Sequence, residues 1–303
     1  MPSIQTQEQQ RVAPTLKVLN NIQQRNTNTT KCGELSPRNK DNECTEGTKQ
    51  SSSHIEQLFF QNICSIYMSQ PIQSHHKQYV VIFDWDDTLH PTTVITNKKE
   101  YQSIQLLLTF GKRLYELLSY YIKMFGGNNI YIITNATKYW PLKSLQMLSS
   151  MYKNQVIKNK TDNNMFYDIN YFSAIYALLS ILKIKIISAN HHYSKEFPNV
   201  PLVWKIKTFQ AVTNQHFDFK DKENIYTLIS IGDSESEFVA STQAKTMLMK
   251  QNGKNGNGHI FRLHRIKLQR NPSIKQMMKQ FKCLMDEAYL LKIERGSITI
   301  CYP

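Results

Sequence analysis

Short apolar runs that each end in a polar residue constrain the fold more than any other feature of this sequence. Three of them are YVVIFD (79–84), NIYIIT (129–134) and YTLISIGD (226–233), and a fourth is LKIKIISAN (182–190). Their β-branched and aromatic residues predict buried strands. Strands that alternate with helices form a parallel sheet covered on both faces, so the predicted fold class is α/β. The predicted helices between the strands span 102–125, 140–152, 171–182 and 204–214.

The N-terminal part of the chain differs in composition from the rest. Residues 1–53 are rich in Gln, Asn, Thr, Ser and Lys. Such a segment buries too little apolar surface to offset the entropy of ordering the chain, so we predict a disordered tail. Apolar positions within 54–70 recur at helical spacing and predict a lead-in helix. The predicted domain therefore spans 54–303, and its motifs lie within 79–244.

The C-terminal segment 245–303 is predicted to hold a hairpin and a helix. After a helix over 235–244, the Gly/Asn-rich stretch 252–258 is typical of a hairpin turn. Pro272 then opens an amphipathic helix that ends near residue 293. A run of basic side chains in this segment indicates either the solvated face of a hairpin strand or a docking site for an acidic or phosphorylated partner. The run comprises Arg262, His264, Arg265, Lys267 and Arg270.

Composition limits the partners and the compartment. The formal net charge of +14 favours anionic partners, but Lys is abundant throughout the chain, so we do not expect a nucleic-acid partner. The five cysteines form no CxxC pair, which indicates free thiols in a reducing compartment. The sequence shows no signal-peptide pattern and no apolar stretch of membrane-spanning length. We therefore expect an intracellular protein, cytoplasmic or nuclear, with no membrane partner.

The motif DWDDTL (84–89) directly follows the first strand. Residues two apart on an extended chain point the same way, so Asp84 and Asp86 are predicted to face one site. One carboxylate of such a pair can attack phosphorus while its neighbour exchanges a proton with the leaving oxygen. The alternative is a strand-terminal turn followed by a helix cap.

The other strand ends offer groups that suit a phosphate and a metal ion. The hydroxyl of Thr134 and the following Asn135 are predicted to bind oxygens of the phosphoryl group, although a Thr at a strand end is often only a turn residue. A lysine of PLVWKIKTF, Lys205 or Lys207, is predicted to neutralise the nucleophile and the phosphate. GDSESE (232–237) supplies acidic oxygens of the kind that Mg²⁺ prefers.

The order of these elements resembles the haloacid dehalogenase (HAD-like) superfamily. The matching features are a strand ending in DxDxT, a strand ending in Thr, a Lys, and a strand ending in GD with an acid four residues later. The segment ISAN…FPNVPLVWKIKTF is also similar to a protist and fungal subgroup, in which the lysine after the Trp corresponds to Lys205. By this resemblance the nucleophile is Asp84, the general acid/base Asp86, the phosphate-binding residue Thr134, the lysine Lys205, and the metal ligands Asp84, Asp86 and Asp233, with Glu237 behind them.

The resemblance implies a Rossmann-like HAD fold and a magnesium-dependent phosphate monoester hydrolase that forms an aspartyl-phosphate. The spacing of the motifs leaves no room for a large cap domain over the site. In the superfamily, open sites tend to serve bulky substrates, so the expected partner is a phosphorylated small molecule or protein. Two alternatives stay open, namely a phosphotransferase that uses the same site and a catalytically silent binding or regulatory protein.

Overall fold

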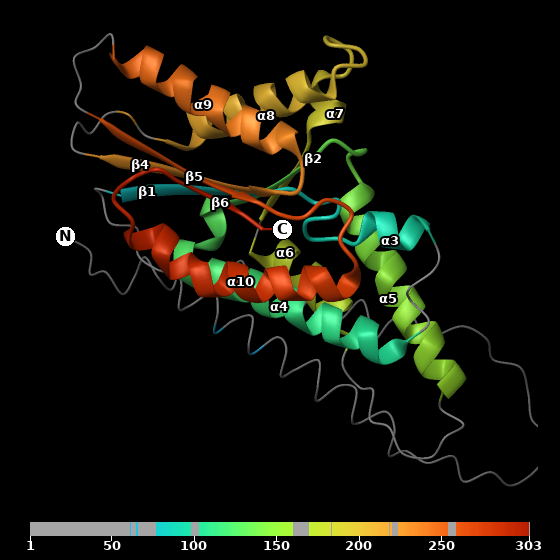
Figure 1. The fold of residues 1–303 in the computed structure, drawn as a ribbon. Coiled ribbons are helices and arrows are strands. Elements are labelled where there is room, and N and C mark those ends of the chain that lie inside the picture. Colours follow the sequence, from blue (N-terminus) through green and yellow to red (C-terminus); the bar gives the residue numbers. More distant parts are fainter. Residues whose placement is uncertain are drawn as a thin grey trace, which may run out of the picture. The chain divides into compact units, whose positions relative to one another are not determined.

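The computed structural model describes most of the chain from Lys77 onward, and Figure 1 shows its path. The predicted tail 1–53 lies outside the described residues, as does nearly all of the predicted helix 54–70. All described residues belong to one compact unit, Ser52–Pro303. They are 77–97, 103–159, 170–182, 184–217, 219, 224–253 and 259–302, together with Gln61 and Ser65.

Six parallel strands form one sheet in the order β3-β2-β1-β4-β5-β6. The central strand β1 pairs with β2 on one side and β4 on the other, and its residues from Tyr79 onward are buried. A strand buried on both faces reads as a continuous apolar run, as YVVIF does. The predicted α/β class is therefore confirmed, with a Rossmann-like parallel sheet. The strands are β1 Lys77–Phe83, β2 Ile130–Thr134, β3 Lys185–Ser188, β4 Ile225–Gly232, β5 Ile260–Lys267 and β6 Ile298–Cys301.

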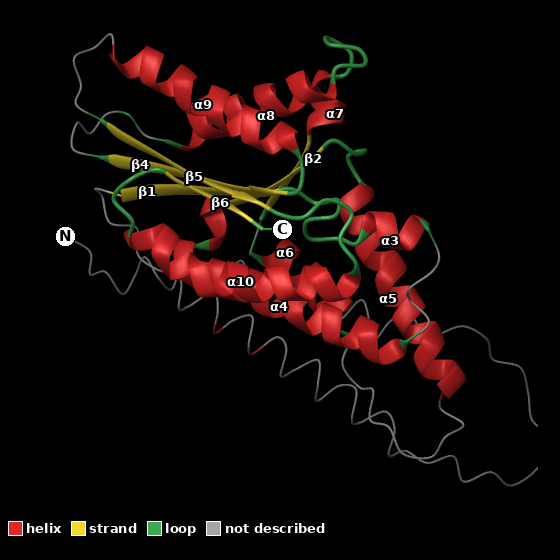
Figure 2. Cartoon of the chain, viewed as in Figure 1, coloured by secondary structure: helices red, strands yellow, loops and turns green. Residues whose placement is uncertain are grey.

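Helices cover both faces of the sheet (Figures 1 and 2). α8 and α9 pack together on one face, over a core that includes Tyr131, Phe209 and Tyr226, whereas α4 and α10 pack together on the other. Between β1 and α8 the described residues hold no separate inserted domain. The helices are α3 Thr92–Thr96, α4 Ile104–Phe125, the short 3-10 helix η2 Gly127–Asn129, α5 Trp140–Asn159, α6 Tyr171–Ile181, α7 Ala189–Tyr193, α8 Pro201–His216, α9 Glu235–Gly253 and α10 Ile274–Ile293.

The predicted C-terminal hairpin is wrong. α9 runs to Gly253, nine residues beyond its predicted end, and β5 pairs with β4 in parallel. The helix continues because its last turns are rich in strong helix formers and because Ala244 and Leu248, four residues apart, are buried in the core beneath it. The Gly/Asn-rich stretch thus connects a helix to a parallel strand. The final helix was predicted correctly, and it starts at a capping box formed by Ser273 and Gln276.

The basic residues of β5 do not form a solvated hairpin face. His264 is fully buried, whereas Arg262 and Arg265 are half-buried. Lys267 pairs with Glu235 at the start of α9. Alternate residues of a strand covered on both sides must enter the packed layers, which explains this burial.

Two general predictions can be compared with the described residues. Cys283 and Cys301 are free cysteines, as predicted, and the other three cysteines lie outside the described part of the chain. Among the helices that the structure describes, none is both long enough and apolar enough to cross a membrane.

Candidate functional site

Three neighbouring strands end at the candidate site. Because β2, β1 and β4 are adjacent and parallel, Thr134, Asp84 and Asp233 emerge at the same edge of the sheet. The main-chain N–H of Asp84 donates to the carbonyl of Ile231 at 2.9 Å, which extends the pairing of β1 with β4 and fixes the Asp84 backbone. Ligands of open α/β sheets bind at this edge. The structure thus brings together the three strand-end residues that the sequence singled out.

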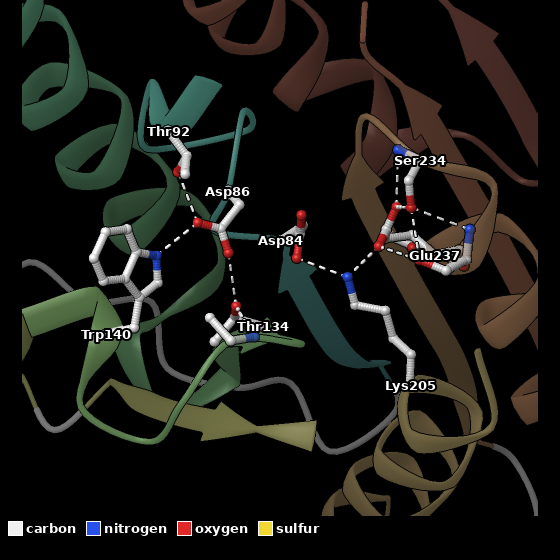
Figure 3. Close-up of polar contacts among 11 residues, drawn as sticks. Asp84, Asp86, Thr92, Thr134, Trp140, Lys205, Ser234 and Glu237 are labelled. Atoms are coloured by element: carbon white, nitrogen blue, oxygen red, sulfur yellow. Dashed lines mark hydrogen bonds and ion pairs between the residues drawn. The ribbon is translucent and has the colours of Figure 1, made fainter. Parts of the chain in front are cut away.

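Lys205 of α8 lies between two buried carboxylates (Figure 3). Its Nζ donates to Asp84 Oδ1 at 2.7 Å and also to Glu237 Oε1. The exposed fractions of the three side chains are 3%, 8% and 4%. Lys207 lies elsewhere, with its Nζ 5.6 Å from the centre of the Phe197 ring. Of the two candidate lysines, the structure therefore places Lys205 beside Asp84.

The segment GDSESE holds Glu237 in place. The N–H and hydroxyl of Ser234 donate to Glu237 Oε2 at 3.0 and 2.6 Å, and the hydroxyl of Ser236 donates to Oε1 at 2.8 Å. Glu237 also packs against the backbone of Gly232, where an added Cβ would lie 2.5 Å from Glu237 Cγ. The glycine at the end of β4 therefore makes room for the carboxylate that binds Lys205.

Burial and neighbouring charges oppose each other in this cluster. Burial raises the pKa of Asp84 well above its ordinary value, and Glu237 and Asp233 add to the rise, while Lys205 opposes it. For Lys205 burial acts to lower the pKa, but Asp84 and Glu237 raise it overall, so the lysine is protonated. Burial acts to raise the pKa of Glu237, yet Lys205 and the two serines lower it overall, which keeps Glu237 ionised. Glu237 is thus a counter-ion of Lys205 in this cluster.

Asp233 completes an acidic cluster that could hold a metal ion. Oxygens of Asp84, Asp233 and Glu237 all lie within 4.8 Å of one another. Burial raises the pKa of Asp233 to about 6, and the charges of Glu237 and Asp87 contribute. Three carboxylates around a single lysine leave an excess of negative charge that a divalent cation would neutralise. Carboxylate oxygens are the ligands that Mg²⁺ prefers, so the donor set fits this ion.

The side chain of Asp86 is directed away from the acidic cluster (Figure 3). Its Oδ1 accepts hydrogen bonds from Thr92 Oγ1 at 2.7 Å and Trp140 Nε1 at 2.6 Å. Its Oδ2 accepts from Thr134 Oγ1 at 2.9 Å. The Asp86 carboxylate thus lies beside Thr134 and is not one of the three carboxylates that meet in the acidic cluster. Its position beside the strand ends suits proton exchange.

A tight turn after β1 connects the motif to α3. The N–H groups of Leu89 and His90 both donate to the carbonyl of Trp85 at 2.9 Å. Asp87 has a φ of 54°, in the left-handed region that Asp tolerates better than most residues. Its carboxylate accepts from the N–H and hydroxyl of Thr93 at 2.9 and 2.5 Å, at the start of α3. The turn predicted as the alternative for DWDDTL is therefore present together with the site.

Several residues of the site were not predicted from the sequence. Thr92 and Trp140 bind Asp86, although neither follows from strand or helix periodicity. The Pro91–Thr92 pair, which follows His90 just after the motif, is a helix-start signal that could have directed attention to Thr92. Asn135 follows Thr134 as expected, and its Oδ1 is buried with no hydrogen-bond partner among the described residues.

Comparisons of the chain with protein-family models, with curated proteins and with solved structures found no match.

Proposed function

We propose that this protein is a magnesium-dependent phosphate monoester hydrolase of the haloacid dehalogenase superfamily that acts through an aspartyl-phosphate on Asp84. The observation that carries the proposal is the ion pair between Asp84 and Lys205 at the carboxyl edge of the central strand. Burial and the neighbouring acids disfavour the charge of Asp84, whereas Lys205 favours it, and a bound cation would favour it further, as attack on a phosphoryl group requires. Phosphoryl transfer requires mainly such positioning and charge compensation.

The reaction would proceed in two steps. In the first, an oxygen of Asp84 attacks phosphorus, the bond from phosphorus to the ester oxygen breaks, and Asp86 gives a proton to the leaving alcohol. In the second, Asp86 takes a proton from water, the hydroxide attacks phosphorus, and the bond to Asp84 breaks, releasing inorganic phosphate. Lys205 binds the phosphoryl oxygens, and the Thr134 hydroxyl, which donates to Asp86 in this structure, turns its proton to them when the ester binds. Asn135 adds a polar side chain at the same strand end.

Mg²⁺ held by Asp84 and Asp233 would neutralise charge on the phosphoryl oxygens and on the clustered carboxylates. Glu237 binds Lys205 and so keeps the lysine in reach of Asp84. The substrate is then a phosphate ester, of a small molecule or of a protein.

The first test is hydrolysis of p-nitrophenyl phosphate by the purified protein, with Mg²⁺ and with EDTA. Asp84→Asn keeps the shape of the side chain but removes the nucleophile, so turnover should fall to background. Asp286→Asn, at an exposed aspartate of α10, is the matched control and should keep full turnover. Circular dichroism checks that each variant is folded.

Each alternative has its own outcome in this assay. Activity that persists in Asp84→Asn would refute the nucleophile. Phosphate transfer to an added alcohol in preference to water would favour the phosphotransferase. No turnover by the folded wild-type protein on aryl phosphates and on a panel of phosphopeptides would favour the silent binding protein.

A further inference from the structure

Three side chains donate hydrogen bonds to the Asp86 carboxylate. Both donors to Oδ1 come from outside the DxDxT motif, Thr92 from α3 and Trp140 from α5 (Figure 3). The third donor, Thr134, binds Oδ2, and its own hydroxyl oxygen accepts from the N–H of Ala136 at 2.9 Å. Elements far apart in the chain therefore converge on a single side chain.

A buried histidine extends this arrangement by one residue. His90 is 1% exposed, and its Nδ1 lies 3.0 Å from Thr92 Oγ1. The Thr92 hydroxyl has one proton, and its short contact with Asp86 Oδ1 shows that the carboxylate receives it. We assign the proton of the neutral His90 ring to Nδ1, so that it donates to the Thr92 hydroxyl oxygen; the other tautomer would direct an Nε2 proton at the main chain of Ser144. A chain of hydrogen bonds runs from His90 through Thr92 to Asp86.

Two tryptophans hold the His90 ring in this orientation. The Trp85 ring stacks on it, with centroids 5.8 Å apart and an angle of 15°, and the Trp140 ring meets it edge-on at 5.8 Å. Trp85 Nε1 donates to Ser144 Oγ at 3.0 Å, which links the stack to α5. Trp140 thus contacts the histidine with its ring and Asp86 with its indole N–H.

We propose that His90, Thr92 and Trp140 are positioning residues that fix the carboxylate of Asp86 for proton transfer, with its Oδ1 saturated and its Oδ2 left to exchange the proton. The proposal rests on the proposed function for the role of Asp86 as acid and base. It assigns the exchange to Oδ2 because that oxygen has a single donor, Thr134, whereas Oδ1 has two. None of the three positioning residues contacts the phosphoryl group in this scheme.

The histidine offers a sharp test, because two amides mimic its two nitrogens. Asn places its N–H₂ near the position of Nδ1, and Gln places it near that of Nε2. We expect His90→Asn to keep most of the turnover and His90→Gln to lower it by about tenfold to hundredfold. This loss is part of the roughly 100- to 10,000-fold that general acid–base catalysis contributes to rates. Equal activity of the two variants would overturn the role of Nδ1.

The threonine is tested with a pair of the same design and the tryptophan with a single variant. Thr92→Ser keeps the hydroxyl and should keep kcat, whereas Thr92→Val and Trp140→Phe should lower kcat with little change in KM. Thr96→Val is the matched control, since Thr96 is exposed on the same helix and its hydroxyl binds only main-chain carbonyls. Activity of Thr92→Val equal to that of Thr92→Ser would overturn the role of the hydroxyl.

The leaving group separates positioning from a merely structural role. Phenolate is a poorer leaving group than p-nitrophenolate and depends more on the proton from Asp86. Under single-turnover conditions, Thr92→Val should therefore slow phosphoryl transfer from phenyl phosphate more than from p-nitrophenyl phosphate. An equal loss on both substrates, with unchanged stability in urea, would overturn the proposal.

A measurement that needs no turnover separates this proposal from the proposed function. In ¹⁵N-labelled protein the His90 ring should show a proton on Nδ1, with resonances assigned by their loss in His90→Asn. The indole N–H that is missing in Trp140→Phe should shift in Asp86→Asn. A proton on Nε2, where the main chain of Ser144 lies near, would overturn the hydrogen-bond chain. If these signals appear but the wild type hydrolyses no phosphate ester, the proposed function fails, and the use of the chain in proton transfer fails with it.

Discussion

Replacing Lys205 by methionine should destabilise the protein strongly, because it removes the cation between two buried carboxylates. At an effective dielectric constant of about 20, the attraction across the 2.7 Å contact with Asp84 is about 6 kcal/mol. The cost of burying the charges offsets much of this in the wild type. Removal of one partner leaves that cost uncompensated, so we expect a loss of about 3–5 kcal/mol in the free energy of unfolding.

Urea denaturation at pH 7.5 with EDTA measures this loss. Lys279→Met, at an exposed lysine of α10, is the matched control and should change stability by less than about 0.5 kcal/mol. The double variant Lys205→Met/Glu237→Gln should be more stable than the sum of the single effects by about 0.5–3 kcal/mol, because it removes one of the stranded charges. A Lys205→Met protein as stable as the wild type, or strictly additive effects, would refute the reasoning.

Two further predictions concern a close packing contact and a buried histidine. Gly232→Ala should displace Glu237 from Lys205, destabilise the protein by about 1–3 kcal/mol and lower turnover. Gly296→Ala is the control, because the nearest atom to its added Cβ lies 3.8 Å away. It should leave stability in urea and turnover unchanged. Burial, with help from the charge of Lys185, lowers the pKa of His216 to about 4 from its ordinary 6.5, so between these pH values the unfolded chain binds a proton that the folded chain does not. The free energy of unfolding should therefore rise with pH across this window, by at most about 3 kcal/mol from His216. Urea titrations at several pH values measure this rise, and His216→Gln should make it smaller. An unchanged pH dependence in His216→Gln would contradict the prediction.

The strand ends could be predicted from the sequence because their signals are local. A buried parallel strand reads as one apolar run, and the polar residue that stops it must emerge at the carboxyl edge of the sheet. Asp84, Thr134 and Asp233 follow that rule. The resemblance to the haloacid dehalogenase superfamily pointed to Lys205, whereas the residues themselves left Lys207 as an alternative.

The errors arose where the outcome depends on tertiary packing. The Gly- and Asn-rich residues after Gly253 are compatible with a hairpin turn and equally with a connection from a helix to a parallel strand. The packing of α9 against β5 decides between these two structures. The hydrogen bonds from Thr92 and Trp140 to Asp86 join α3 and α5, whose relative placement no local pattern encodes. The orientation of Asp86 was missed for this reason.

The pairing of the central strand also bears on how the chain can fold. β1 is complete at residue 83, but its partner β4 begins only at Ile225, so one edge of β1 stays open while the intervening residues are synthesised. Asp84 meets Lys205 across 121 residues of chain, and Glu237 arrives 32 residues later still. Such long-range closure slows folding and leaves an exposed edge that can pair with another chain. Fragments that end before β4 should therefore aggregate, and a working site should form only in the last cooperative step of folding.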